Sequence, residues 1–168
     1  VAELTKEPVY KRAQMGVGYL AQEASVFRRL SVEDNIRAVL EMTDFSKEYQ
    51  NERVESLIEE FRLQKVRKSL GIQLSGGERR RTEIARAVAI NPAFILLDEP
   101  FSQIAPLHVA TLQTLIRQEK ATKGILLTDH MYRHVTGIAD RLYVMADGQA
   151  YPCENDEDLV RRGYLNHL

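Results

Sequence analysis

Two neighbouring carboxylates, Asp98 and Glu99, directly follow a run of four apolar residues, Phe94 to Leu97. The run is continuous and has the length of a strand, as in a parallel sheet that is covered on both faces. Ligands of open α/β sheets bind at the carboxyl ends of the strands. Asp98 there suits Mg²⁺, usually held through water, and Glu99 suits a group that orients or deprotonates an attacking water. A solvated acidic pair in a loop is the alternative, and the preceding apolar strand favours the site.

A second candidate site is the segment Leu74-Ser75-Gly76-Gly77-Glu78. Ser75 and Glu78 have the spacing of a capping box, which predicts a helix from here to about Ile90. The two glycines let another molecule approach the backbone closely. The N–H groups at the start of the helix then form an anion site. An ordinary capped helix after a glycine turn is the alternative.

Two further polar residues follow predicted strands. Gln22 comes after the strand that ends at Leu20, and His130 comes after the strand Ile125–Thr128. In a shared sheet both would lie at the edge that carries Asp98. A Gln amide there can contact a metal or a water, and a His can bind a phosphate or the attacking water. Each residue alone is more typical of a protein surface.

Two other clusters favour ordinary surface roles. His130 and His134 are spaced i, i+4, but zinc needs a third and usually a fourth ligand, so a pair on a helix face is expected. Arg79-Arg80-Arg81 is predicted to be a solvated helix face, because neighbouring side chains on a helix point in different directions.

The elements that must position these residues alternate between strand and helix. Strands are predicted at 15–20, 94–97 and 125–128, and a helix with one apolar stripe (Val109, Leu112, Ile116) lies between the last two. Asp147-Gly148 predicts a hairpin between strands at 142–145 and 149–151. This order indicates an α/β fold.

A mostly helical block, residues 26–88, interrupts that fold. Ser31 and Asp34 mark a helix start, and the helix is predicted to reach about Met42. Val54, Leu57, Ile58 and Phe61 form an apolar stripe, which predicts a second helix over 52–68.

Composition narrows the classes of function. The 168 residues carry 23 basic and 24 acidic side chains, which argues against nucleic-acid binding driven by bulk charge. The one cysteine, Cys153, excludes an internal disulfide and suits a reducing compartment. No apolar run is long enough to cross a bilayer and no signal peptide is visible. We therefore expect a cytosolic protein, or one attached to a membrane only through partners. Because the chain begins with Val1, we expect it to be a piece of a longer protein.

These motifs follow one another along the chain in the order Gln22, Leu74–Glu78, Phe94–Pro100 and His130. In this order they resemble the Q-loop, the signature, the Walker B strand and the H-loop of ABC transporter ATP-binding subunits. The resemblance covers nearly the whole chain. It implies part of a P-loop NTPase (RecA-like) ATPase core with an inserted helical subdomain. Residues 1–25 would be core up to the Q-loop, 26–88 the helical subdomain, and 89–168 core with Walker B, D-loop, H-loop and the hairpin.

The resemblance also implies the chemistry. ATP and Mg²⁺ would be the cofactors, with Glu99 and His130 as catalytic residues and Asp98 and Gln22 as metal contacts. The nucleotide contacts would be Gln22, Ser75, Gly76, Gly77 and Glu78.

Partners are implied in the same way. Two ATPase chains would form a homodimer in which the helix starting at Ser75 faces the γ-phosphate bound by the other chain, beneath transmembrane subunits on the cytoplasmic face of the inner membrane. No nucleic-acid partner is expected. Residues 18–32 and 74–87 look like the ATPases of lipopolysaccharide-export systems. Branched-chain amino-acid importer ATPases are the nearest competitors. An aromatic residue flanked by Arg28 and Arg29 has the composition of an interface anchor, so Phe27 is a candidate docking residue, with core packing as the alternative.

The chain departs from the family pattern in ways that leave a second reading open. It contains no Gly-x-x-x-x-Gly-Lys-Ser/Thr loop, which the family places upstream of the Q-loop, so we expect that loop before Val1. The chain alone is then expected neither to bind ATP tightly nor to hydrolyse it. Ala105 stands where the family usually has the D-loop aspartate, Ala21 replaces a common proline, and the match weakens from about Gly148. A non-catalytic or truncated ABC-type module is therefore the alternative.

Overall fold

The computed structural model describes residues 3–161, 163 and 164, and the chain forms two compact units. The first unit extends to Met131 and contains all the candidate site residues. The second unit begins at Tyr132.

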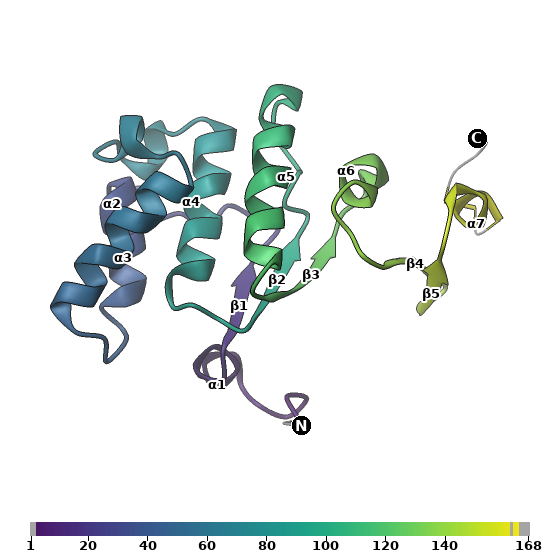
Figure 1. Cartoon of the computed structure of the whole chain (residues 1–168), viewed down its shortest axis with the longest axis horizontal. Helices are drawn as coiled ribbons and strands as arrows, with labels where there is room; N and C mark the ends of the chain where they lie inside the picture. The colour runs from purple at the N-terminus through teal and green to yellow at the C-terminus, as the bar shows by residue number, and fades with distance from the viewer. Residues whose placement is uncertain (1–2, 162, 165–168) are drawn as a thin grey trace. The chain divides into compact units, whose positions relative to one another are not determined.

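The first unit is built on a three-stranded parallel sheet (Figure 1). Its strands lie in the order β1 (Val17–Leu20), β2 (Phe94–Asp98) and β3 (Gly124–Thr128), and each neighbouring pair is parallel. A short helix, α1 (Val9–Gln14), precedes β1 and was not predicted from the sequence. Because the strands run the same way, the residues that follow them meet at one edge of the sheet. The predicted α/β fold and its strands are confirmed, with shifts of one or two residues at the strand ends.

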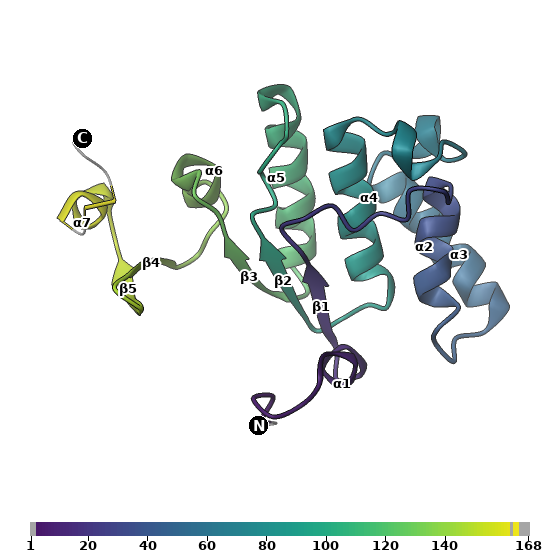
Figure 2. The ribbon, with the colours of Figure 1, turned by 180° about the vertical axis from the view of Figure 1, so that it is seen from behind.

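The two faces of this sheet differ in how far they are covered. Helices α4 (Gly76–Ala89) and α5 (Pro106–Lys120) lie on one face, where Leu20 and Ile95 are buried. Figure 2 shows the unit from behind. On the opposite face of the sheet, the strand register aligns Tyr19, Leu96 and Leu126 in a row across the three strands. These three side chains are 56%, 36% and 64% exposed. The prediction of strands buried on both faces is therefore wrong for the part of the chain that the structure describes.

The helical block contains α2 (Val32–Leu40), α3 (Lys47–Glu60) and two 3-10 turns, η1 (Gln64–Val66) and η2 (Gly71–Gln73). The Ser31 hydroxyl caps α2 by accepting the Asp34 N–H, which confirms the predicted start. The helix predicted over 52–68 was placed too late. It begins after the cap Ser46, and it ends at Glu60 because Arg62 adopts a left-handed φ of 53°. Its predicted apolar stripe is confirmed, since all four residues are buried.

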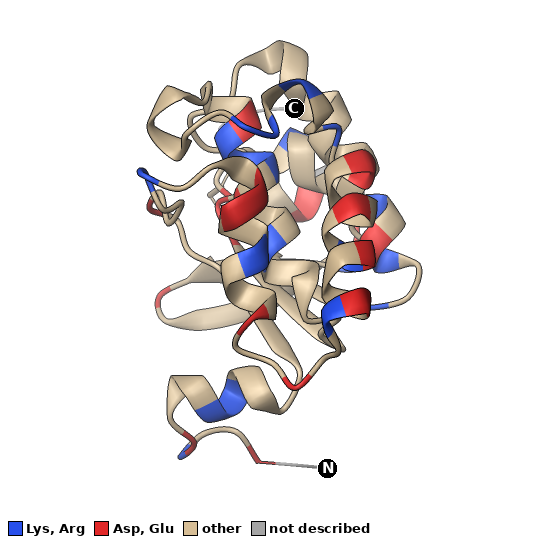
Figure 3. Ribbon diagram, turned by 90° about the vertical axis from the view of Figure 1, so that its left-hand side faces the viewer, with Lys and Arg blue, Asp and Glu red and all other residues tan. Residues whose placement is uncertain are grey.

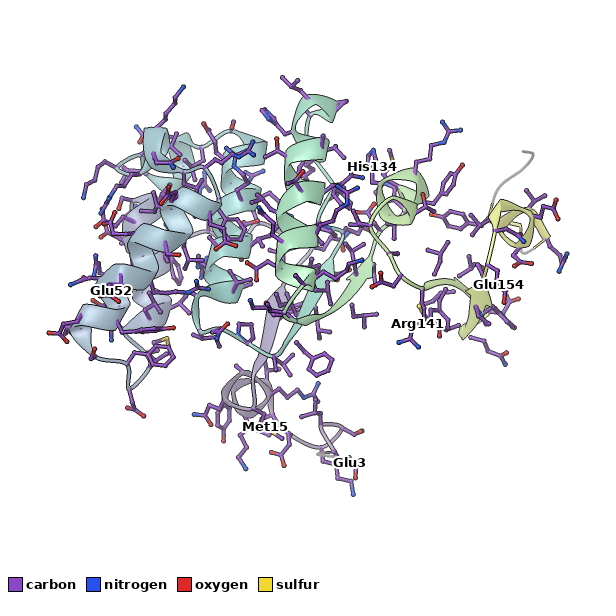
Figure 4. All side chains as sticks on the ribbon, viewed as in Figure 1. Glu3, Met15, Glu52, His134, Arg141 and Glu154 are labelled. Atoms are coloured by element: carbon purple, nitrogen blue, oxygen red, sulfur yellow. The ribbon has the colours of Figure 1, made fainter. Side chains whose placement is uncertain are left out.

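The outer surface of this block carries mixed charge. Figure 3 shows acidic and basic residues interleaved along its helices, and Glu52, labelled in Figure 4, is one of the exposed residues of α3. Glu33 differs from these exposed charges because its carboxylate is almost buried. It accepts hydrogen bonds from Arg67 Nε and Lys68 Nζ, each at 2.7 Å. These hydrogen bonds hold the Glu33 pKa far below its usual range. The pair of cations thus fastens α2 to the segment that follows α3.

The second unit consists of α6 (Tyr132–Thr136), the antiparallel strands β4 (Leu142–Ala146) and β5 (Gln149–Cys153), and α7 (Asp156–Arg161). Asp147 and Gly148 have φ of 50° and 75°, the two left-handed residues of a type I′ turn. The predicted hairpin is therefore confirmed. Among the described residues of the whole chain, no helix is long and apolar enough to cross a membrane.

Candidate functional site

Three candidate residues lie where β2 and β3 end, and we call Asp98, Glu99 and His130 the strand-end group. Asp98 and Thr128 are the last paired residues of the two strands, and Thr128 Oγ1 donates to Asp98 Oδ1 at 2.6 Å. Glu99 Oε2 lies 3.6 Å from His130 Nδ1. This distance exceeds a direct hydrogen bond, but catalytic contacts often tighten only when the substrate is bound. The structure therefore brings together the carboxylates and the histidine that the strand pattern placed at one edge.

The backbone at Glu99 is in a conformation that costs energy. Its φ is 44°, in the left-handed region that residues with a Cβ seldom adopt. Its N–H donates to the Thr128 carbonyl at 2.8 Å, and its carbonyl accepts the Ser102 N–H at 3.1 Å. Such conformations persist where the surroundings enforce them, and they cluster at active sites. Nothing in the sequence marks this position, since no glycine stands there.

Arg80 holds much of this backbone in place. The prediction that Arg80 belongs to a solvated helix face is wrong. Only 5% of Arg80 is exposed. Its guanidinium donates to the carbonyls of Asp98 (2.9 Å), Glu99 (2.7 Å), Pro100 (3.2 Å) and Ala21 (3.0 Å). One side chain of α4 thus holds the loop after β2 and the residue before Gln22. Of its neighbours, Arg81 is half-buried and donates to the Phe61 carbonyl.

Glu83, one turn further along α4, fixes the segment that follows Gln22. Its carboxylate accepts the N–H groups of Ser25 at 2.7 Å and Val26 at 3.2 Å, and it pairs with Arg80 at 3.2 Å. Gln22 itself is exposed and lines a cavity of about 20 Å³ together with Gly76 and Arg80. The structure therefore places Gln22 beside Gly76 of its own chain, while its contact with a metal stays a prediction.

The signature segment, residues 74–78, forms the predicted capping box at the start of α4. The Ser75 N–H donates to the Glu78 carboxylate at 2.9 Å, and the Glu78 N–H donates to the Ser75 hydroxyl at 3.4 Å. The hydrogen bond from the Ser75 hydroxyl lowers the pKa of Glu78, so that carboxylate stays ionised. The helix ends at Ala89, one residue before the predicted end.

The glycines of this segment are in close contact with their own chain. A Cβ at Gly76 would lie 2.8 Å from the Gln103 carbonyl, and one at Gly77 would lie 3.1 Å from the His108 ring. Both neighbours belong to the segment that follows β2 and begins α5. The two glycines therefore let α4 pack against that segment, in addition to any close approach by another molecule.

The histidine pair does not form the expected helix face. His130 lies in the turn before α6, whereas His134 belongs to α6. The described residues contain no group of three or more His, Cys, Asp or Glu side chains that could hold a metal ion by themselves.

Comparisons with known proteins identify the family. A family model described as "ABC transporter" matches residues 2–102. A probable ABC transporter ATP-binding protein of Azorhizobium caulinodans is 50% identical, over 97% of this chain and 60% of its own length. An uncharacterized ABC transporter ATP-binding protein of Rhizobium meliloti is 47% identical, over 97% of this chain and 63% of its own length. The lipopolysaccharide export system ATP-binding protein LptB of Escherichia coli K12 is 48% identical, over 94% of this chain and 68% of its own length. The chain thus spans about three fifths of the first two relatives.

Proposed function

Because this chain belongs to the ABC transporter family, we propose that it is the part of an ATP-binding subunit that hydrolyses ATP to power a transporter. The observation that carries the proposal is the strand-end group at the carboxyl edge of a parallel sheet, with Glu99 Oε2 3.6 Å from His130 Nδ1. Members of this family bind ATP with Mg²⁺ in general. Glu99 orients or deprotonates the attacking water, and His130 hydrogen-bonds that water or a phosphate.

The residues at the strand ends fit Mg²⁺. One oxygen of Asp98 accepts the Thr128 hydroxyl, which orients the carboxylate at the edge of the sheet. Sites for Mg²⁺ usually combine one or two carboxylates with substrate phosphates and water, so a cage of protein ligands is not required. Asp98 and Gln22 would hold the ion, which when bound neutralises charge on the phosphates.

The signature segment acts on a second copy of the chain. Ser75, Gly76, Gly77 and Glu78 begin a helix whose N–H groups attract anions, and they face the γ-phosphate of a nucleotide bound by the partner copy. Two copies would therefore enclose two ATP molecules.

Substitution of Glu99 tests the hydrolytic role. In the intact protein, Glu99→Gln should lower ATP turnover by about 10²–10⁴-fold, the usual cost of losing a positioned base, while Mg-ATP binding survives. Glu52→Gln, an exposed glutamate of α3, is the matched control. Turnover near that of the wild type in Glu99→Gln would contradict the assignment.

A non-catalytic ABC-type module is the second candidate. Ala105 at the D-loop position favours it. The intact wild-type protein would then show no ATP turnover that depends on Glu99.

The 168-residue chain alone is predicted not to bind Mg-ATP tightly. A low-micromolar dissociation constant by isothermal titration would contradict that prediction.

The transmembrane partner docks at Phe27 in this proposal. Phe27 is 47% exposed, so it is not a core residue, and the Arg86 guanidinium stacks 4.4 Å from its ring centroid. Phe27→Ala should weaken co-purification with the membrane subunits, whereas Phe45→Ala, another partly exposed phenylalanine, should not. This docking would place the subunit on the cytoplasmic face of the inner membrane.

Lipopolysaccharide is the proposed cargo because several relatives, 46–48% identical, are named for its export. A branched-chain amino-acid importer is the alternative.

A further inference from the structure

Asp129 lies between Thr128 and His130, and neither the sequence motifs nor the proposed mechanism gives it a role. Its side chain is fully buried, with an exposed fraction of 0%. A buried carboxylate is costly unless its oxygens are well paired. The Asp129 Oδ2 atom accepts the Phe101 N–H at 3.1 Å, and Oδ1 accepts the Met131 N–H at 2.8 Å. His130 Nδ1 lies 3.9 Å from Oδ1.

The hydrogen bond from the Phe101 N–H joins the two loops of the strand-end group, while the Met131 bond lies within the loop of His130. Phe101 follows Glu99 by two residues, and Met131 directly follows His130. The pairing between β2 and β3 ends at Asp98 and Thr128, so regular sheet hydrogen bonds do not extend to either loop. The Glu99 N–H bond to Thr128 reaches across, and the Asp129 carboxylate adds a side-chain hydrogen bond from one loop to the other.

We propose that Asp129 is a positioning residue, whose carboxylate sets the separation of Glu99 and His130 by fastening the loop of one to the loop of the other. The inference rests on the proposed function, because the reacting groups are those of the strand-end group. The left-handed φ of Glu99 makes this loop dependent on its surroundings. Arg80 holds the loop through the carbonyls of residues 98–100, and Asp129 holds it through the Phe101 N–H.

A local turn explains only half of the geometry. An aspartate that accepts the N–H two residues ahead forms a common Asx-turn, and the Met131 bond is of this kind. The Phe101 bond spans 28 residues of sequence and is not part of such a turn. Accepting both N–H groups needs two oxygens. An asparagine offers one oxygen and an NH₂ group, which would face one of the two donors.

Two substitutions test the link in the intact protein. Asp129→Asn keeps the shape but loses one acceptor. Asp129→Ser keeps an acceptor for the Met131 N–H but is too short to reach Phe101, so it isolates the long-range bond. We expect both to lower kcat by about 10²-fold, the usual effect of a misplacement near 1 Å, with little change in KM for Mg-ATP. Asp44→Asn, an exposed aspartate of the helical block, is the control and should match the wild type.

The outcomes separate this inference from the proposed function. If the wild type shows no turnover that depends on Glu99, the proposed function fails. If the wild type is active and the folded Asp129→Ser protein has wild-type kcat, the positioning role is overturned. Thermal unfolding of each variant is measured alongside. A drop in kcat that appears only together with loss of Mg-ATP binding or of the folded state would also overturn it, because that pattern indicates a structural role.

Discussion

The strand-end group and the signature segment are built in different ways. Asp98, Glu99 and His130 are held by partners that are distant in sequence, chiefly Arg80 and the end of β3. The signature segment holds itself, because Ser75 and Glu78 cap each other within one turn. The group proposed to act on the water is thus fixed by the fold. The group proposed to meet a second copy is capped locally, and within it Ser75 is exposed while Gly77 is buried.

Removing Arg80 should give the largest change in stability. Arg80→Met takes away the donor that four carbonyls share and leaves the buried Glu83 carboxylate without its cation. Breaking a buried pair in this way typically costs about 3–5 kcal/mol. Urea unfolding of the two proteins measures the difference.

The neighbouring Arg79 provides the matched control, since on the same helix it is more exposed than Arg80. Arg79→Met should change the free energy of unfolding by less than about 0.5 kcal/mol, as surface substitutions usually do. Equal effects of the two substitutions would remove the contrast between long-range and local support.

This contrast also decides what the sequence could reveal. The capping box follows from two residues three apart, and the carboxylates follow from the strand that precedes them, so both were predicted. The role of Arg80 was missed because its partners lie up to 59 residues away. A signal was present, since Arg80 falls three residues after Gly77 and four before Ile84, on the buried stripe of α4. The left-handed φ of Glu99 and the uncovered sheet face depend on tertiary packing, and no local pattern reports them.

Removing the Ser75 cap should have a smaller effect on stability. Ser75→Ala loses the hydroxyl that accepts the Glu78 N–H, and an N-cap is worth about 1 kcal/mol. Ser46→Ala, which removes the equivalent cap of α3, should cost about as much.

Activity should separate these two caps. If the signature segment meets the nucleotide of a second copy, only Ser75→Ala lowers ATP turnover in the intact protein. Equal turnover in the two variants would leave Ser75 with a capping role alone.

An effect about as large as the loss of a cap is expected from Glu60 of α3, a long-range contact that is only partly buried. Burial and a hydrogen bond with the Glu119 carboxylate raise the pKa of Glu60 to about 7, while Arg53 and Lys123 oppose the rise. The folded protein therefore keeps a proton that the unfolded chain releases near pH 4.5, so stability should fall as pH rises from about 4.5 to about 7. Because solvent screens this half-exposed group, we expect a loss of about 1 kcal/mol. Urea unfolding at pH 5 and pH 8 measures this loss of stability.

Substitution tests the assignment to Glu60. Glu60→Gln should abolish this part of the pH dependence, whereas Glu59→Gln, at the exposed neighbouring residue, should not. If Glu60→Gln leaves the pH dependence unchanged, the contact between Glu60 and Glu119 contributes nothing measurable to stability. The larger effect of Arg80 would then follow from its burial and not from the long-range nature of its contacts.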